Sequence, residues 1–190
     1  MTHGLSAAAY LDAHRALAGK LDLQAFEAGV ALIRATFEAG RQIITCGNGG
    51  SAYAASHFIT DWNKMVTLAT GKKFRGISLC DNLGMVTAFA NDTSFEEIFV
   101  GQLRAILEPG DLVIAVSGSG NSPNVIKAIE YANDARARTL ALVGYDGGRL
   151  KQIAAQTVWV PSFDMQLCED VHLMFGHVVM KALCGASIRD

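Results

Sequence analysis

The sequence has no excess of charge of either sign. Its 16 lysine and arginine residues face 18 aspartate and glutamate residues, which gives a formal net charge of -2. This balance provides no electrostatic footprint for nucleic acid or for an anionic membrane surface. No apolar run approaches the ~20 residues that span a bilayer, and the N-terminus lacks the continuous apolar core of a signal peptide. We therefore expect no nucleic-acid and no membrane partner, a small molecule or another protein as the ligand, and a cytoplasmic location.

Cysteine and proline are scarce as well. The four cysteines, Cys46, Cys80, Cys168 and Cys184, form neither a Cys-x-x-Cys pair nor a dense framework, so we expect free, buried thiols. Only three prolines in 190 residues, together with 51% hydrophobic residues, indicate one large ordered core. The many alanines favour helices that bury more than one face, which in a short chain often reflects self-association.

After a helical start, the hydrophobic pattern alternates between helices and apolar strands. Two helices are expected within residues 6–39, with a break near residues 19–22 and Asp22 as the N-cap of the second. Strands are expected at 42–46, 75–80, 111–116, 139–144 and 157–161. Further helices are expected at 51–65, 83–89, 94–107, 122–135, 148–155 and 164–186.

Apolar strands separated by helices indicate a parallel sheet that is covered on both faces. The sequence therefore predicts an α/β fold, a doubly wound five-stranded parallel sheet flanked by helices, with an N-terminal helical arm. We find no internal repeat and no long linker, so we expect a single domain. It would consist of an arm (1–40), an α/β core (41–162) and a C-terminal helix (163–190).

A first glycine turn, residues 47–51 (Gly-Asn-Gly-Gly-Ser), separates the first predicted strand from a helix. Such a turn presents free backbone N–H groups and the positive end of a helix dipole, which together attract an anion. Asn48 adds a polar side chain, and Ser51 is either the N-cap or a direct ligand of the anion. The pattern matches neither the dinucleotide-binding fingerprint nor a P-loop, so a nucleotide is not the first expectation. A turn that uses glycine for tight geometry alone is the alternative.

A second turn, residues 117–122 (Ser-Gly-Ser-Gly-Asn-Ser), follows the third predicted strand. Ser122 is the predicted N-cap of the next helix, with Pro123 at its first position. The serine hydroxyls and backbone N–H groups can converge on one point. Because no lysine accompanies them, a phosphate monoester on a small molecule fits better than a nucleoside triphosphate. Simple loop flexibility is the alternative reading.

Ionisable side chains interrupt two otherwise apolar helices. His57 and Asp61 are four residues apart and so share one helix face, where they could bind a metal together or act as an acid and base pair. Glu169, Asp170, His172 and His177 lie in the last helix, and placing such groups among apolar residues is costly without a function.

Taken together, these motifs resemble the sugar isomerase (SIS) domain family with its flavodoxin-like fold, and within it the phosphoheptose isomerases. The resemblance rests on the two turns, on Asp81, on Asn91-Asp92 and on Asp146-Gly147-Gly148, and it covers nearly the whole chain. It implies isomerisation of sedoheptulose 7-phosphate to D-glycero-D-manno-heptose 7-phosphate by enediol proton transfer. It also implies a homotetramer with active sites formed between subunits.

The resemblance further implies roles for individual residues. A zinc ion would be bound by His57, Asp61, Glu169 and His177, of which Asp61 and His177 would also be the acid and base. The substrate would be held by Asn48, Gly49, Gly50, Ser51, Asn91, Asp92, Ser117, Gly118, Ser119, Ser122 and Glu169. Three of these positions depart from the family pattern: Asp61 replaces glutamate, Glu169 replaces glutamine, and Gly118 replaces threonine.

Two observations leave alternatives open: the spacing of Glu169 and His177 in the last helix, and the substitution at the expected base, Asp61. Eight helical residues rise ~12 Å, so Glu169 and His177 share one ion only if the helix start is irregular or different subunits contribute. A non-catalytic SIS protein that binds a protein partner, of the kind that associates with a replication initiator, would tolerate a substituted base. An isomerase of a different sugar phosphate is the other alternative.

Overall fold

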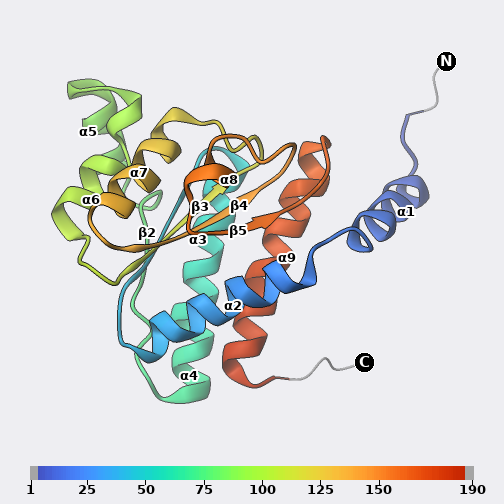
Figure 1. Cartoon of the computed structure of the whole chain (residues 1–190), viewed down its shortest axis with the longest axis horizontal. Coiled ribbons are helices and arrows are strands. Elements are labelled where there is room, and N and C mark those ends of the chain that lie inside the picture. The colour runs from blue at the N-terminus through green and yellow to red at the C-terminus, as the bar shows by residue number, and fades with distance from the viewer. Residues whose placement is uncertain (1–3, 187–190) are drawn as a thin grey trace.

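The computed structural model describes residues 4–186, so the outer limits of the predicted domain, residues 1–3 and 187–190, lie outside the described residues. Its helices are α1 (Ala7–Ala18), α2 (Leu23–Glu38), α3 (Gly50–Asp61), α4 (Thr67–Thr70), α5 (Leu83–Asp92), α6 (Val100–Ile106), α7 (Pro123–Asp134), α8 (Leu150–Ile153) and α9 (Met165–Cys184). Its strands are β1 (Ile43–Gly47), β2 (Gly76–Ser78), β3 (Leu112–Ser117), β4 (Arg138–Val143) and β5 (Gln156–Trp159) (Figure 1). A π-helical turn (η1, Trp62–Val66) and a 3-10 turn (η2, Phe95–Glu97) complete the assignment.

The five strands form one parallel sheet in the order β2-β1-β3-β4-β5. The predicted five-stranded parallel sheet flanked by helices is therefore confirmed. Strands β1 and β3 are neighbours in space but not in sequence, so the strand order reverses between them. In open α/β sheets, the crevice at the carboxyl ends of two such strands is where ligands bind.

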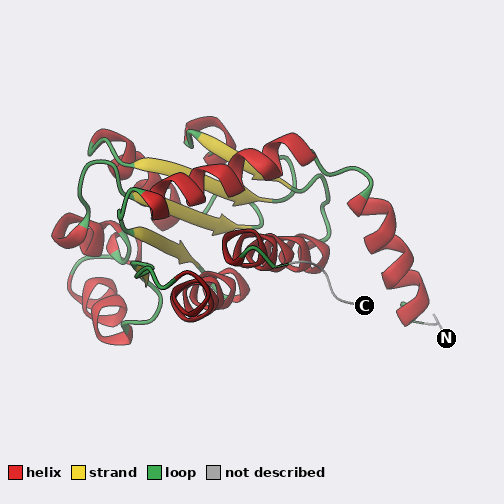
Figure 2. Ribbon diagram, turned by 90° about the horizontal axis from the view of Figure 1, so that it is seen from below, coloured by secondary structure: helices red, strands yellow, loops and turns green. Residues whose placement is uncertain are grey.

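Alternate residues of each strand enter two separate cores. On β3, Leu112, Ile114 and Val116 pack against α2, α3 and α9, whereas Val113 and Ala115 pack against α6 and α7. Figure 2 shows helices on both sides of the sheet. Burial on both faces explains why the strands are apolar without alternation.

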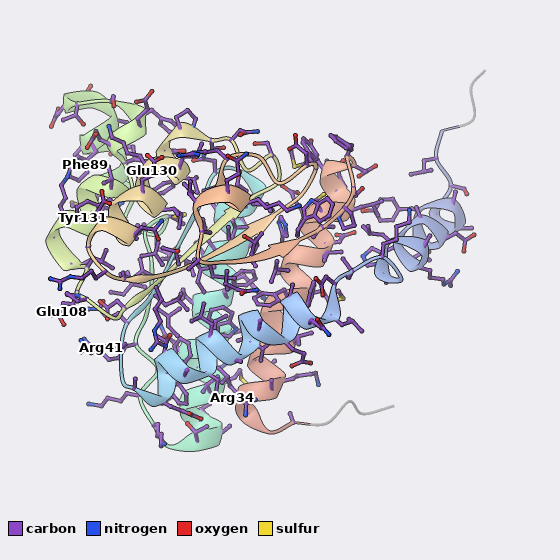
Figure 3. The ribbon with its side chains drawn as sticks, in the orientation of Figure 1. Arg34, Arg41, Phe89, Glu108, Glu130 and Tyr131 are labelled. Carbon is purple, nitrogen blue, oxygen red and sulfur yellow. The ribbon has the colours of Figure 1, made fainter. Side chains whose placement is uncertain are left out.

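The N-terminal arm has the two helices and the break that the sequence predicts. Asp22 caps α2 as expected, because its carboxylate accepts hydrogen bonds from the backbone N–H groups of Gln24 and Ala25. Helix α2 crosses the sheet, and Arg34 reaches from it to the carbonyl oxygen of Ala182 at 3.2 Å (Figure 3). Helix α1 projects beside the body of the molecule in Figures 1 and 2.

Two predicted helices are interrupted. The helix expected over 51–65 changes at Trp62 into the π-helical turn η1, where Trp62 is fully buried, stacks on Phe58 and donates from its ring N–H to the carbonyl oxygen of Gly176 at 3.0 Å. These contacts of Trp62 stabilise the wider π-helical turn, which holds one more residue than an α-helical turn. The helix expected over 94–107 is split into η2 and α6.

Among the described residues, no helix combines the length and the apolar character that a bilayer crossing requires. The four cysteines are all free, as expected, but only Cys46 and Cys168 are buried; Cys80 and Cys184 are partly exposed.

Candidate functional site

The first glycine turn joins the carboxyl end of β1 to α3. Gly49 occupies the N-cap position with φ of 53°, a left-handed conformation that favours glycine. Of the two roles expected for Ser51, that of N-cap is therefore wrong, because Ser51 is the second residue of α3 and is buried. The role of direct ligand stays a prediction. Within the described part of the chain, the backbone N–H groups of Gly50 and Ser51 have no acceptor, so they remain available for an anion.

The second turn joins the carboxyl end of β3 to α7. The backbone N–H of Gly120 donates to the hydroxyl of Ser117, and that of Asn121 to the hydroxyl of Ser119, each at 3.2 Å. Ser122 occupies the predicted N-cap position ahead of Pro123, but its side chain makes no capping hydrogen bond. Its hydroxyl is therefore free to meet a ligand.

The two turns face each other across one cavity of about 250 Å³ at the reversal point of the strand order. The cavity is lined by Asn48, Gly49, Ser51, Val116, Ser117, Gly118, Ser119, Ser122, Met165 and Glu169. We call this set of residues the cradle. It combines serine hydroxyls with backbone N–H groups at helix N-termini, which is the chemistry that binds a phosphate group.

Some predicted substrate-binding residues lie elsewhere in one chain. Asn91 and Asp92 are exposed at the end of α5, where the Asn91 amide donates to the Asp92 carboxylate at 2.8 Å, and neither lines the cradle. Gly50 lines a neighbouring cavity of about 460 Å³ together with His57. Glu169 lines both cavities, so it stands between the cradle and His57.

His57, Asp61 and His177 come together on adjacent faces of α3 and α9. The Nε2 atoms of the two histidines are 3.1 Å apart. Oδ2 of Asp61 lies 3.4 Å from Nε2 of His57 and 4.0 Å from Nε2 of His177. Ligands at ~2.0–2.1 Å in a tetrahedral zinc site are separated by roughly 3.3 Å, so this donor set fits a divalent metal ion with an open position. We call it the His-Asp-His group.

Glu169 does not belong to the His-Asp-His group within one chain. Glu169 lies near the start of α9, where its carboxylate occupies the space that a side chain at Gly50 would need. The structure thus brings together three of the four predicted metal ligands. The helical rise between Glu169 and His177 explains why the fourth is apart.

Met165 lines the cradle and Asn124 lies beside it, and neither was predicted as a site residue from the sequence. A Cβ atom at Gly118 would overlap the sulfur of Met165, so Met165 fills the space beside Gly118. Asn124 forms two hydrogen bonds with Asn48, each 2.9 Å long. Its position directly after the second turn, two residues beyond Ser122, was the available signal, but its partner lies 76 residues away in the sequence.

The cysteines near the cradle are not equipped as nucleophiles. Burial raises the pKa of the Cys46 thiol well above its usual range and, to a lesser extent, that of the Cys80 thiol beside the Gly47 carbonyl. Both therefore stay protonated near neutral pH, and the thiolate is the reactive form.

Comparison with known proteins identifies the family. Residues 9–144 match the SIS domain family. The phosphoheptose isomerase of Helicobacter pylori is 38% identical over 160 residues, which cover 84% of this chain and 83% of that protein. The phosphoheptose isomerase of Citrifermentans bemidjiense is 36% identical over 171 residues, which cover 90% of this chain and 88% of that protein. The solved phosphoheptose isomerase of Neisseria gonorrhoeae superimposes with a TM-score of 0.86 at 26% identity, covering 94% of this chain and 97% of that one. The chain therefore belongs to the SIS domain family and, within it, to the phosphoheptose isomerases.

Proposed function

We propose that this protein interconverts sedoheptulose 7-phosphate and D-glycero-D-manno-heptose 7-phosphate. The observation that carries the proposal is that α3 contributes to both places: Ser51 of the phosphate-binding cradle lies at its start, and His57 and Asp61 of the His-Asp-His group lie farther along it. His57 follows Ser51 by six residues, a rise of ~9 Å along the helix. An extended sugar phosphate reaches over such a distance, with its phosphate at one end and its reacting carbons at the other.

The cradle would hold the phosphate end of the sugar. The hydroxyls of Ser51, Ser117, Ser119 and Ser122 can donate to phosphate oxygens, and the backbone N–H groups of Gly50 and Ser51 add the helix N-terminus. This binding is remote from the bonds that change, so it positions the substrate rather than reacting with it.

Asp61 and His177 would move the protons. One of them takes the proton from C1 of the ketose while the oxygen on C2 gains a proton, which gives the enediol. Loss of the proton from the oxygen on C1 and delivery of a proton to C2 then give the aldose. No atom other than hydrogen moves, and the two side chains, 4.0 Å apart, face the same small space.

We propose zinc as the metal of the His-Asp-His group, with His57, Asp61 and His177 as its ligands. The donor distances above support a metal of this size. When bound, the ion would polarise the sugar carbonyl as a Lewis acid. Glu169 would complete the set only if it came from another subunit or if the start of α9 moved.

We also propose a homotetramer in the cytoplasm, with sites shared between subunits. Exposed apolar side chains on α3 and α4 support self-association, since Tyr53 is 81% and Leu68 is 73% exposed. In such an assembly, Asn91, Asp92 or Glu169 of one chain could reach the site of another.

The test is conversion of sedoheptulose 7-phosphate by the purified protein, followed by ¹H NMR, with and without added zinc. We expect the aldose to form, and we expect Asp61→Asn and His177→Ala to lower kcat by ~100-fold or more. Asp61→Glu is the matched control, because it keeps a carboxylate and should retain far more activity than Asp61→Asn.

The alternatives predict other outcomes. Turnover of a five- or six-carbon ketose phosphate but not of the heptose would identify a different sugar phosphate isomerase. Binding of the sugar phosphate with no turnover of any, in the presence of zinc, would favour the non-catalytic SIS protein.

A further inference from the structure

The two turns of the cradle are linked by a reciprocal pair of amide side chains. Nδ2 of Asn48 donates to Oδ1 of Asn124, and Nδ2 of Asn124 donates to Oδ1 of Asn48, both at 2.9 Å. Asn48 belongs to the first turn, and Asn124 is the second residue of α7, directly after the second turn. The pair therefore spans the crevice where the strand order reverses.

No other side-chain hydrogen bond joins the first turn to the second within residues 4–186. The β1–β3 ladder ends at Gly47 and Val116, so beyond that point the two turns are separate loops of backbone. Asn121 stabilises the second turn in a different direction, since its side chain accepts from the backbone N–H of Arg149 at 2.9 Å. Among the described residues, the Asn48–Asn124 pair thus supplies the direct side-chain link between the two turns.

Asn124 is suited to position the cradle and not to touch its ligand. Asn124 is 1% exposed and does not line the cavity, whereas Asn48 does. Oδ1 of Asn124 also accepts from the backbone N–H of Val125 at 3.0 Å, which fixes the orientation of the amide. A buried amide with both ends paired is expensive to disturb, because each lost partner leaves an unsatisfied polar atom.

We propose that Asn124 is a positioning residue that holds the two phosphate-binding turns in register through Asn48. A phosphate group bound by both turns requires their donors at one fixed separation. Without the pair, the cradle must be reassembled around the phosphate each time, which weakens binding of the phosphate end. The inference rests on the proposed function for its kinetic readout, but its binding readout needs only inorganic phosphate.

The experiment compares Asn124→Ala with Asn133→Ala, a control at the other end of the same helix. Asn133 also makes two side-chain hydrogen bonds, with Ile153 and Thr139, each 2.8 Å long. We expect Asn124→Ala to raise KM for sedoheptulose 7-phosphate and the Kd for inorganic phosphate on the order of tenfold, with kcat within about threefold of the unaltered protein. Asn133→Ala should lower Tm without changing KM or Kd.

A second arm tests whether Asn124 acts through Asn48. In the Asn48→Ala background, the added Asn124→Ala change should raise Kd by less than twofold, because the pair is already lost. If Asn124→Ala does not fold, Asn124→Asp replaces it: it keeps the size and the acceptor but cannot donate to Asn48, and should also raise Kd.

The outcomes separate the two proposals. An unchanged Kd and KM in folded Asn124→Ala or Asn124→Asp protein would overturn the positioning role, as would equal effects of Asn124→Ala with and without Asn48. A raised Kd for phosphate in a protein that isomerises no sugar would support the positioning role while the proposed function fails.

Discussion

At the scale of single residues, helix α9 carries two histidines in opposite settings. His177 is exposed and lies beside Asp61 and His57, whereas His172 is 1% exposed. Neither ring nitrogen of His172 has a hydrogen-bond partner of normal geometry in the described part of the chain. Burial lowers the pKa of His172 from its ordinary value of 6.5 to about 4, although the nearby Val143 carbonyl opposes this shift.

This difference predicts how stability depends on pH. The unfolded chain binds a proton at His172 below pH 6.5, whereas the folded chain does so only near pH 4. The free energy of unfolding should therefore be greatest above pH 6.5 and fall by about 3 kcal/mol as the pH drops from 6.5 to 4. Urea unfolding at several pH values measures this.

His172→Gln should remove most of that dependence, since glutamine does not titrate. His177→Gln, on the exposed face of the same helix, is the matched control and should leave it largely in place. Equal pH dependence in the unaltered protein and in His172→Gln would contradict the assignment.

At the scale of elements, the second turn interlocks with the glycine turn that precedes α8. The backbone N–H of Leu150 donates to the carbonyl oxygen of Gly120 at 3.0 Å. Gly120 has φ of 65°, and a Cβ atom there would overlap the carbonyl of Gly147. The backbone of the glycine turn before α8 thus packs against the second turn and is hydrogen-bonded to it.

Gly120→Ala should therefore lower the free energy of unfolding by at least about 3 kcal/mol, through left-handed strain and a backbone overlap together. Gly40→Ala is the control, because Gly40 has φ of 66° and open space around its Cα, so it should cost only about 1 kcal/mol. Similar losses in the two variants would show that the interlock contributes nothing.

The same elements show what the sequence could and could not predict. Glycine turns, helix caps and apolar strands are local patterns, so the strands, the α2 cap at Asp22 and the cradle serines could be located from residue types and spacing. The Asn48–Asn124 pair and the π-helical turn at Trp62 depend on partners far along the chain. The exclusion of Glu169 from the His-Asp-His group was foreseeable in part, from the rise of the helix alone.

At the scale of the whole molecule, an apolar surface covers α4 and the end of α9. Leu68, Met65 and Met180 line a cavity of about 540 Å³ there, and Leu68 is 73% exposed. Exposed apolar area of this kind favours association with another protein surface, and the proposed tetramer would bury it.

If the proposed tetramer forms, Leu68→Glu should therefore lower the mass measured by light scattering from that of a tetramer to that of a smaller species. It should also lower activity, because the proposed assembly shares its sites between subunits. Leu23→Glu is the control, since Leu23 is similarly exposed, at 70%, but lies at the start of α2. A monomeric unaltered protein, or a tetramer that Leu68→Glu leaves intact, would contradict the proposed assembly.

The most direct test of the central claim is to incubate the protein, with zinc, and sedoheptulose 7-phosphate in D₂O and to follow the carbon-bound hydrogens by NMR. The enediol mechanism predicts that deuterium enters the sugar at C1 or C2 as the aldose forms, and that Asp61→Asn abolishes both changes. If no deuterium enters at carbon and no aldose appears, although the sugar phosphate binds in the cradle, the proposed isomerase function is contradicted.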